Sequence, residues 1–240
     1  MILPLHDDNP TRGRPIVTVA LIVACSVVFF GQVIAGPGAG ERIVYAFGVI
    51  PAVLFGDAHL PPDLAVVPPA ASIFTSMFLH GGLWHLLGNM LYLWIFGNNV
   101  EDAMGHGRFI AFYLLCGIAA VFAQALPDPT STVPMVGASG AISGVLGAYM
   151  LLYPHARILL GLPLGFVIVQ LGRFPALWVL ALWFLMQLAM NAFAGQGPDG
   201  ASGGVAFRAH IGGFVAGMIL IPFFKHRDVA LWQPPRRRWR

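Results

Sequence analysis

The sequence predicts an all-α membrane protein, a single bundle of six transmembrane helices that forms one domain over residues 1–240. Hydrophobic residues make up 58% of the chain and charged residues only 10%, whereas soluble domains hold roughly 45–50% and about 25%. The apolar residues are gathered in runs near the length of about 20 residues that crosses a bilayer. A chain of this composition requires lipid as its solvent.

Each expected helix is one such run, closed by polar, Gly or Pro residues that favour loops. The first run is uninterrupted, the third ends before Pro127, and the fourth is short and rich in small residues. The expected spans are, in chain order, Ile16–Ile34, Trp84–Val100, Phe109–Ala125, Ser139–Tyr153, Pro175–Phe193 and Phe207–Phe224.

Two further apolar stretches are expected to lie outside the spans. The first, Ala35–Gly82, is rich in Pro and Gly and predicts a long loop that lies partly in the membrane interface. The second, Ile158–Val169, is interrupted by Gly161, Pro163 and Gly165. It is expected to form part of the loop before the fifth span.

The charged residues predict the orientation, because Lys and Arg gather on the cytoplasmic side of membrane proteins. Six spans put both termini on one side, which would hold eleven Lys and Arg residues against Arg42 and Arg208 outside. Residues 1–15 do not match a cleaved signal peptide and predict a cytoplasmic segment. The basic tail, residues 225–240, suits anionic lipid headgroups, so no nucleic-acid partner is expected. The compact form suggests a bacterial plasma membrane.

Metal and cofactor motifs are missing from the sequence. Cys25 and Cys116 both lie in apolar runs and form no CxxC motif or disulfide framework. There is no HExxH, and His80 and His85 are five residues apart. We therefore expect no metal and no cofactor.

Polar residues inside apolar spans are costly and often functional. Of the eight histidines, only His85 and His210 fall clearly inside expected helices, and all ten acidic residues are expected in loops or tails. The membrane interior would then offer His, Ser and Asn side chains, but no carboxylate.

The fourth and sixth spans carry a candidate catalytic pair. Ser139 begins the fourth span next to Gly140, and His210, Gly213 and Gly217 share one face of the sixth. Glycine-lined helices can pack closely and could bring His210 against Ser139 as the nucleophile and base of acyl transfer. The same residues also suit plain helix packing, so a structural role stays open.

The second span adds candidate oxyanion donors. In HGGLWHLLGNM, His85 and Asn89 are four residues apart and project from one face. Both side chains can donate hydrogen bonds to a developing oxyanion, and the backbone N–H of Ser139 could add another donor. The alternative is that His85 and Asn89 only join helices together.

Three motifs in this order resemble one family. TSMFLHGGLWHLLGNMLYLWIFGNNVEDAMG, VGASGAISGVLGAY and GGVAFRAHIGGFVAG are similar to segments of the rhomboid intramembrane serine proteases, over about residues 73–224. The resemblance implies that Ser139 is the nucleophile, that His210 is its base, and that His85 and Asn89 line the oxyanion hole. It also implies substrates that are membrane-anchored proteins, cut in or near their transmembrane segment.

The chain departs from some members of that family. Where they carry a Tyr one turn after the nucleophile, this chain has Ser143, and the Trp-Arg pair of their first loop is not evident. Two other readings stay open. One is a transporter or channel, although paired broken helices are not seen. The other is an inactive rhomboid-like binder, a class that normally lacks the Ser or the His that this chain keeps.

Overall fold

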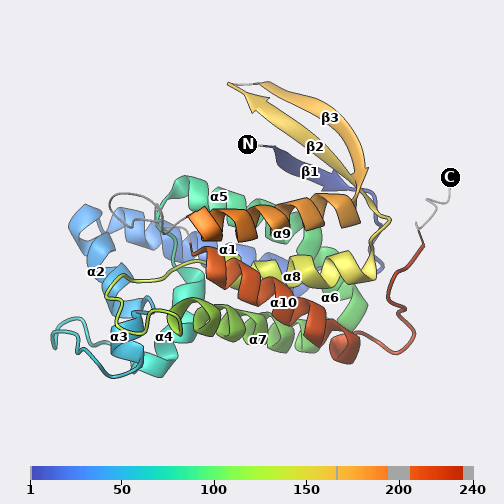
Figure 1. Ribbon diagram of the computed structural model, residues 1–240. Helices are drawn as coiled ribbons and strands as arrows, with labels where there is room; N and C mark the ends of the chain where they lie inside the picture. Colours follow the sequence, from blue (N-terminus) through green and yellow to red (C-terminus); the bar gives the residue numbers. More distant parts are fainter. Residues whose placement is uncertain (1, 166, 194–205, 235–240) are drawn as a thin grey trace.

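The computed structural model describes residues 2–165, 167–193 and 206–234, which form a helix bundle with a small β-sheet along one side (Figure 1). Helices α1 (Ile16–Ile34) and α10 (Phe207–Phe224) have the expected bounds. Three further helices begin and end within a few residues of the expected positions: α7 (His106–Ala125), α8 (Ser139–Leu152) and α9 (Ala176–Phe193).

The chain is an integral membrane protein by the length and composition of its helices. Among the described residues, α1, α7, α9 and α10 are long and apolar enough to cross a bilayer. Helix α8 is apolar but has only 14 residues, which extend about 21 Å against a hydrocarbon core of about 30 Å. The count of six spans stays a prediction.

The second expected span is built from three joined pieces. Helix α5 (Leu83–Tyr92) continues through a π-helical turn (Leu93–Gly97) into α6 (Asn98–Met104). The expectation that all acidic residues lie in loops or tails is wrong here, because the helix runs past Val100 and includes Glu101. This carboxylate is 1% exposed and accepts hydrogen bonds from the first turn of α1, including the Thr18 N–H at 2.8 Å. It satisfies donors that a helix start leaves unpaired.

The expectation of a purely helical fold, with a loop over Ile158–Val169, is wrong. Strands β2 (Arg157–Leu164) and β3 (Val167–Pro175) form an antiparallel hairpin, and β1 (Leu3–Asp7), from the expected N-terminal segment, pairs with β2. Pro163 lies beyond Gly161, the last residue of β2 that pairs with the described part of β1, and proline is tolerated toward the edges of sheets. Gly165 has a φ of 63° and closes the turn. The Gly and Pro residues that predicted a loop therefore shape a hairpin.

The long loop before the second span is partly helical. It contains α2 (Pro37–Phe47), α3 (Pro51–Leu54), α4 (Pro69–Thr75) and the 3₁₀ turn Ser76–Phe78. Each of the three α-helices begins with a proline, which fits the first turn of a helix because the missing N–H would be unpaired there. Here the prolines start helices.

The described C-terminal segment lies beyond one end of the bundle, and β1 starts along the side of the bundle and runs toward the same end (Figure 1). Near the N-terminus, Asp7 accepts a 2.6 Å hydrogen bond from the Tyr149 hydroxyl of α8. Near the C-terminus, the N–H of Trp232 donates to the Leu151 carbonyl of α8 over 2.8 Å. Four arginines of the expected basic tail, in residues 235–240, lie outside the described residues.

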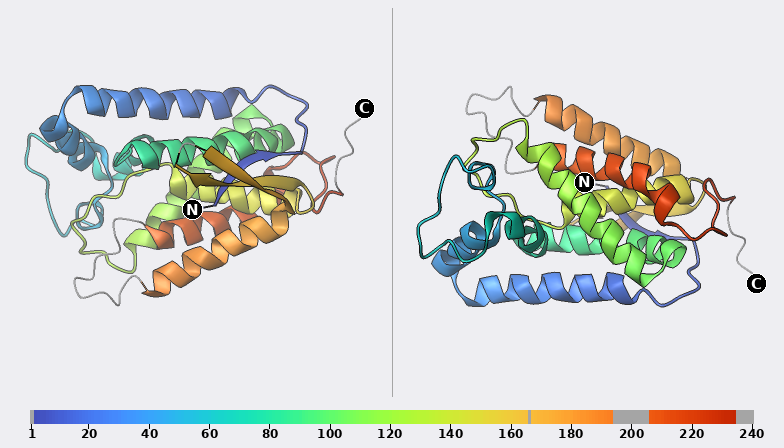
Figure 2. Two further views of the ribbon diagram at one scale, coloured as in Figure 1. Left: turned by 90° about the horizontal axis from the view of Figure 1, so that it is seen from above. Right: turned by 90° about the horizontal axis from the view of Figure 1, so that it is seen from below.

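Helix α8 lies in the middle of the bundle, with α1 and α9 at opposite edges (Figure 2). Eleven of its 14 residues are buried, and its glycines let α10 approach its backbone. A Cβ on Gly213 or Gly217 would collide with the carbonyl oxygen of Gly140 or Gly144, respectively. The expected close packing of the fourth and sixth spans is confirmed. This packing fixes the position of Ser139 along the axis of α10.

Candidate active site

Ser139 is the first residue of α8, at the opposite end of that helix from Leu151 and Leu152, whose carbonyls bind the C-terminal segment. The approach to it is set by Gly137, whose φ of 125° favours glycine. The Gly137 N–H donates to the Ser76 carbonyl over 2.9 Å. The side chain of Ser139 is half-buried. A serine held at a helix start lies beside backbone N–H groups that suit an anion.

His85 and Asn89 of α5 reach the same place. A Cβ on Gly137 would lie 2.8 Å from the His85 Nε2 and 3.7 Å from the Asn89 Nδ2. Both side chains therefore face the backbone two residues before Ser139. Only a glycine leaves room for the imidazole there.

The donors of these two side chains are available. The Gly81 N–H donates to the His85 Nδ1 over 3.5 Å, so the ring proton belongs on Nε2, the nitrogen that faces Gly137. Asn89 is 8% exposed, and its Nδ2 is one of the buried polar atoms without a hydrogen-bond partner in the described part of the chain. A buried donor without a partner normally has an explanation. One explanation is that it donates to the negative charge of an oxyanion that forms only during the reaction.

His80, three residues before the start of α5, packs against this arrangement. Its ring is 2% exposed and meets the His85 ring edge-on, with centroids 5.1 Å apart. Its Nδ1 lies 3.3 Å from the Phe78 carbonyl. The structure thus adds His80 to the candidate site, because it packs directly against His85.

His210 lies in the first turn of α10, one turn before Gly213, which packs on Gly140. This packing puts His210 beside the start of α8. In the residues that the structure describes, no hydrogen bond joins the Ser139 hydroxyl to the imidazole. The His210 Nδ1 is bound instead to the Gln187 Oε1 of α9, 2.8 Å away. Catalytic hydrogen bonds are often long without substrate and tighten when it binds.

Sequence reasoning missed Gln187. The sequence was read for nucleophiles, titratable groups and hydrogen-bond donors, which gave His, Ser and Asn. The amide of Gln187, in an otherwise apolar helix, was passed over. The signal was present, because polar side chains inside spans are costly and call for a partner. Trp183, one turn earlier on α9, was missed as well, and its ring lies 5.9 Å from that of His210. Nothing in its sequence context marks it.

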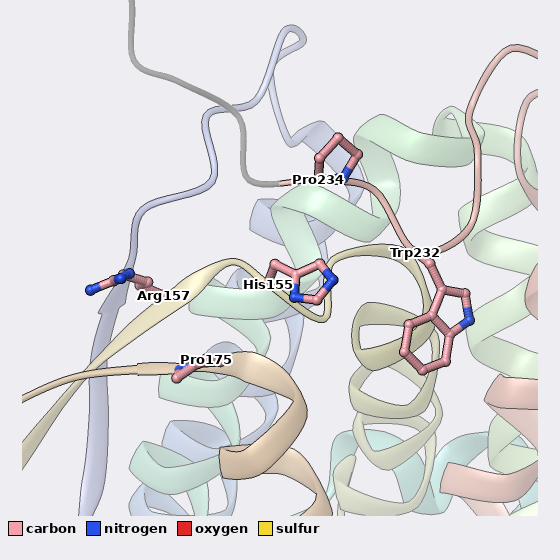
Figure 3. A pocket seen from close by; sticks show the side chains of 5 residues that line it. All are labelled: His155, Arg157, Pro175, Trp232 and Pro234. Atoms are coloured by element: carbon pink, nitrogen blue, oxygen red, sulfur yellow. The ribbon is translucent and has the colours of Figure 1, made fainter.

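A pocket at the other end of the molecule is separate from this site. It is lined by residues of the β2–β3 base, the start of α9 and the C-terminal segment, as Figure 3 shows: His155, Arg157, Pro175, Trp232 and Pro234. It lies beyond the C-terminal end of α8, whereas Ser139 is at the N-terminal end. The candidate active site is therefore the junction of α5, α8, α9 and α10.

Comparison with known proteins identifies the family of the chain. The family model described as the rhomboid domain matches residues 69–227, well over half of the 240 residues. The chain belongs to the rhomboid family. The matched range contains Ser139, His210, His85 and Asn89, together with Gln187. The third resembling motif begins at residue 203, so its first three residues lie outside the described part of the chain.

Several curated rhomboid proteins are similar to the chain. It is 34% identical to the mitochondrial Rhomboid protein 1 of Saccharomyces cerevisiae over 194 residues, which cover 75% of this chain and 52% of that protein. It is 35% identical to the Rhomboid protease GluP of Bacillus subtilis over 139 residues, 58% of this chain and 25% of that protein. The chain thus spans about half the length of the yeast relative and a quarter of the Bacillus one.

Proposed function

We propose that this rhomboid protein is an intramembrane serine endopeptidase with Ser139 as nucleophile and His210 as general base. The observation that supports this best is the unpartnered Nδ2 of buried Asn89, which lies with the His85 Nε2 beside the backbone that leads into Ser139. Donors without partners next to a serine and a histidine suit acyl transfer. Membership of the rhomboid family and a relative named as a rhomboid protease agree with it.

The proposed reaction follows from these roles. The His210 Nε2 takes the proton of the Ser139 hydroxyl while the Oγ attacks the carbonyl carbon of the scissile peptide bond. The imidazolium then gives that proton to the leaving amine, the C–N bond breaks, and an acyl-enzyme remains. Water, deprotonated by His210, attacks the ester carbonyl carbon. The bond to the Ser139 Oγ then breaks, the imidazolium returns its proton to that oxygen, and the new carboxyl terminus leaves. Overall, the reaction consumes one water molecule for each peptide bond that is hydrolysed.

The oxyanion of each tetrahedral intermediate would accept hydrogen bonds from the Asn89 amide, the His85 Nε2–H and the Ser139 backbone N–H. Fixed donors of this kind act strongly in a site of low dielectric constant because they need no reorganisation. Histidine, serine and amides carry the whole reaction in this proposal, which uses no metal or cofactor.

The proposed substrates are membrane-anchored proteins, cut in or near a transmembrane segment. Four helices of the described chain could cross a bilayer, and the candidate site lies among helices. Peptide bonds inside a helix are hidden by their own hydrogen bonds, so the segment must unwind before Ser139 reaches it. Gly or Pro in the substrate would help, because they weaken helices by about 1–3 kcal/mol per residue.

In the proposed topology six spans leave both termini in the cytoplasm of a bacterial cell, with the candidate site near the outer face of the plasma membrane. The described basic residues support this orientation. Arg12, Arg108, Arg157, Arg173 and Lys225 lie in or beside segments at the end of the bundle where α1 and α7 begin and α10 ends (Figure 1), and Lys and Arg favour the cytoplasmic side.

The test is labelling with a fluorophosphonate probe, combined with cleavage of a single-span substrate in proteoliposomes. The wild type should label at Ser139 and cleave, whereas Ser139→Ala should do neither. His210→Ala should lose both, because the two residues act as a unit. Unchanged melting temperatures would show that the variants fold. Cleavage by Ser139→Ala at the wild-type rate would exclude this function, and an unlabelled, inactive wild type would favour a binding protein.

A further inference from the structure

Gln187 is a buried amide in an apolar helix. It is 6% exposed and lies in the middle of α9, in the run ALWVLALWFLMQLAMNAF. Its Oε1 is 2.8 Å from the His210 Nδ1, and its Nε2 donates to the Trp183 carbonyl of the preceding turn over 3.5 Å. Both ends of the amide therefore have a partner.

These two contacts fix the direction of the amide. The Trp183 carbonyl can only accept, so the NH₂ group must point to it and the oxygen must point to His210. An amide oxygen can only accept as well, so the His210 Nδ1 carries the ring proton. The lone pair is then on Nε2, the nitrogen that is free to take a proton from Ser139.

We propose that Gln187 is a positioning residue that holds His210 in the tautomer and orientation of a general base. This deepens the function proposed above and rests on it. In Ser-His-Asp enzymes a carboxylate binds the same nitrogen of the histidine and has the same orienting role. A neutral amide supplies the orientation without placing a charge among transmembrane helices, where it would be costly.

Aromatic side chains complete the support. The rings of Trp183 and His210 are 5.9 Å apart and tilted by 38°, and Trp183 also packs against Phe214 at 6.0 Å. The ring next to His210 is thus supplied by α9, whereas Ser143 of α8 turns back to the Ser139 carbonyl with a 2.7 Å hydrogen bond. This accounts for an oriented base without a Tyr at position 143.

Replacing the Gln187 amide by a carboxylate should change the pH dependence of the reaction in a predictable direction. Among the described residues, the groups that face His210 are Ser139 of α8, His85 of α5, and Gln187 with Trp183 of α9, while the neighbouring Arg208 on α10 is exposed. None of these is an acid. Gln187→Glu keeps the acceptor and adds a charge that stabilises the imidazolium, so the acid limb of kcat/KM against pH should move to higher pH.

The experiment compares Gln187→Met, Gln187→Glu and the exposed-site control Gln170→Met of β3, each as the full chain in proteoliposomes. Gln187→Met has a similar length but no acceptor. It should lower kcat by about 10- to 100-fold, within the range that general-base catalysis contributes, with KM changed less than about twofold because the substrate-binding surface is retained. Gln187→Glu should restore most of kcat at high pH with the shifted acid limb. Gln170→Met should match the wild type.

Wild-type kcat and pH profile in Gln187→Met would overturn the proposal. Equal losses in the Met and Glu variants, with an unshifted acid limb in the Glu variant, would overturn it too, because they indicate a packing role. If Gln187→Met does not fold, the acid limb of Gln187→Glu decides alone. The proposed function is tested separately by the wild type and Ser139→Ala. It would be excluded by cleavage in Ser139→Ala at the wild-type rate, whatever the Gln187 variants show.

Discussion

Gly217 of α10 lies directly on the backbone of Gly144 of α8, so close that a Cβ on Gly217 would lie 2.6 Å from both the Cα and the carbonyl carbon of Gly144. The neighbour is main chain and cannot turn aside. The two helices must separate if a side chain is added. Because Ser139 and His210 lie on these helices, the contact links packing to the geometry of the candidate site.

We therefore expect Gly217→Ala to lower stability by about 1–3 kcal/mol, the usual cost of overpacking, and to reduce cleavage more than its effect on folding explains. Thermal melting and turnover in detergent would measure both. The control is Gly31→Ala in α1, where a Cβ meets nothing within 4 Å. Removing a helical glycine there should raise stability by about 0.5–1 kcal/mol. Equal behaviour of the two variants would contradict the role of the α8–α10 contact.

The helices could be predicted because their apolar runs end at clear breaks. Ile16–Ile34 and Phe207–Phe224 were predicted residue for residue. The hairpin could not be, because Gly161 and Pro163 favour a loop locally. A Cβ on Gly161 would lie 2.6 Å from Leu5 and 2.7 Å from Ile168, so that glycine serves strand contacts that only the folded chain reveals.

The candidate site residues Ser139, His210, His85 and Asn89 were predicted from residue type, spacing and a family resemblance, and their catalytic roles stay a prediction. The tertiary contacts could not be found in this way. That Gly137 packs on His85, or that Gln187 binds His210, depends on how α5, α8, α9 and α10 pack together, and residues distant in sequence meet there.

The oxyanion donors give a second prediction. Asn89→Ala should reduce turnover by about 10²–10³, the usual cost of deleting one such donor, and His85→Ala should act in the same direction. The double variant should lose less than the product of the single effects, because both donors would serve one oxyanion. Fluorophosphonate labelling should slow without disappearing. Wild-type turnover and melting in Asn89→Ala would mean that this buried amide has neither a catalytic nor a structural role.

The distribution of Lys and Arg along the chain gives a third prediction. A reporter fused after Arg240 should read as cytoplasmic, and a tag inserted beside Asp63 should be reached by reagents outside the cell. Asp63 lies in the segment between α1 and α5, on the side of Ser139, and forms a 2.6 Å ion pair with Arg42. The positive-inside rule supports this orientation. A reporter outside the cell would reverse the topology and put the candidate site near the cytoplasmic face.

The buried carboxyl of Asp7 gives a prediction about pH. Burial raises the pKa of Asp7 above its usual value of 3.8, and the Tyr149 hydroxyl, which favours the charged form, only partly offsets this. A raised pKa in the folded state means that folding favours the protonated acid. The contribution of Asp7 to stability is therefore complete below pH 3.8 and is lost as the pH rises through the folded pKa.

Asp7→Asn removes this dependence, so the melting temperature of the wild type minus that of Asp7→Asn should be highest near pH 3.8 and should fall as the pH rises. Tyr149→Phe removes the 2.6 Å hydrogen bond to Asp7 that lowers its pKa, so the fall should move to higher pH in that background. Asp57→Asn in an exposed turn controls for the added amide. A difference that instead grows with pH would show that the folded protein stabilises the Asp7 carboxylate, and that the bond from Tyr149 outweighs burial at the junction of β1 and α8.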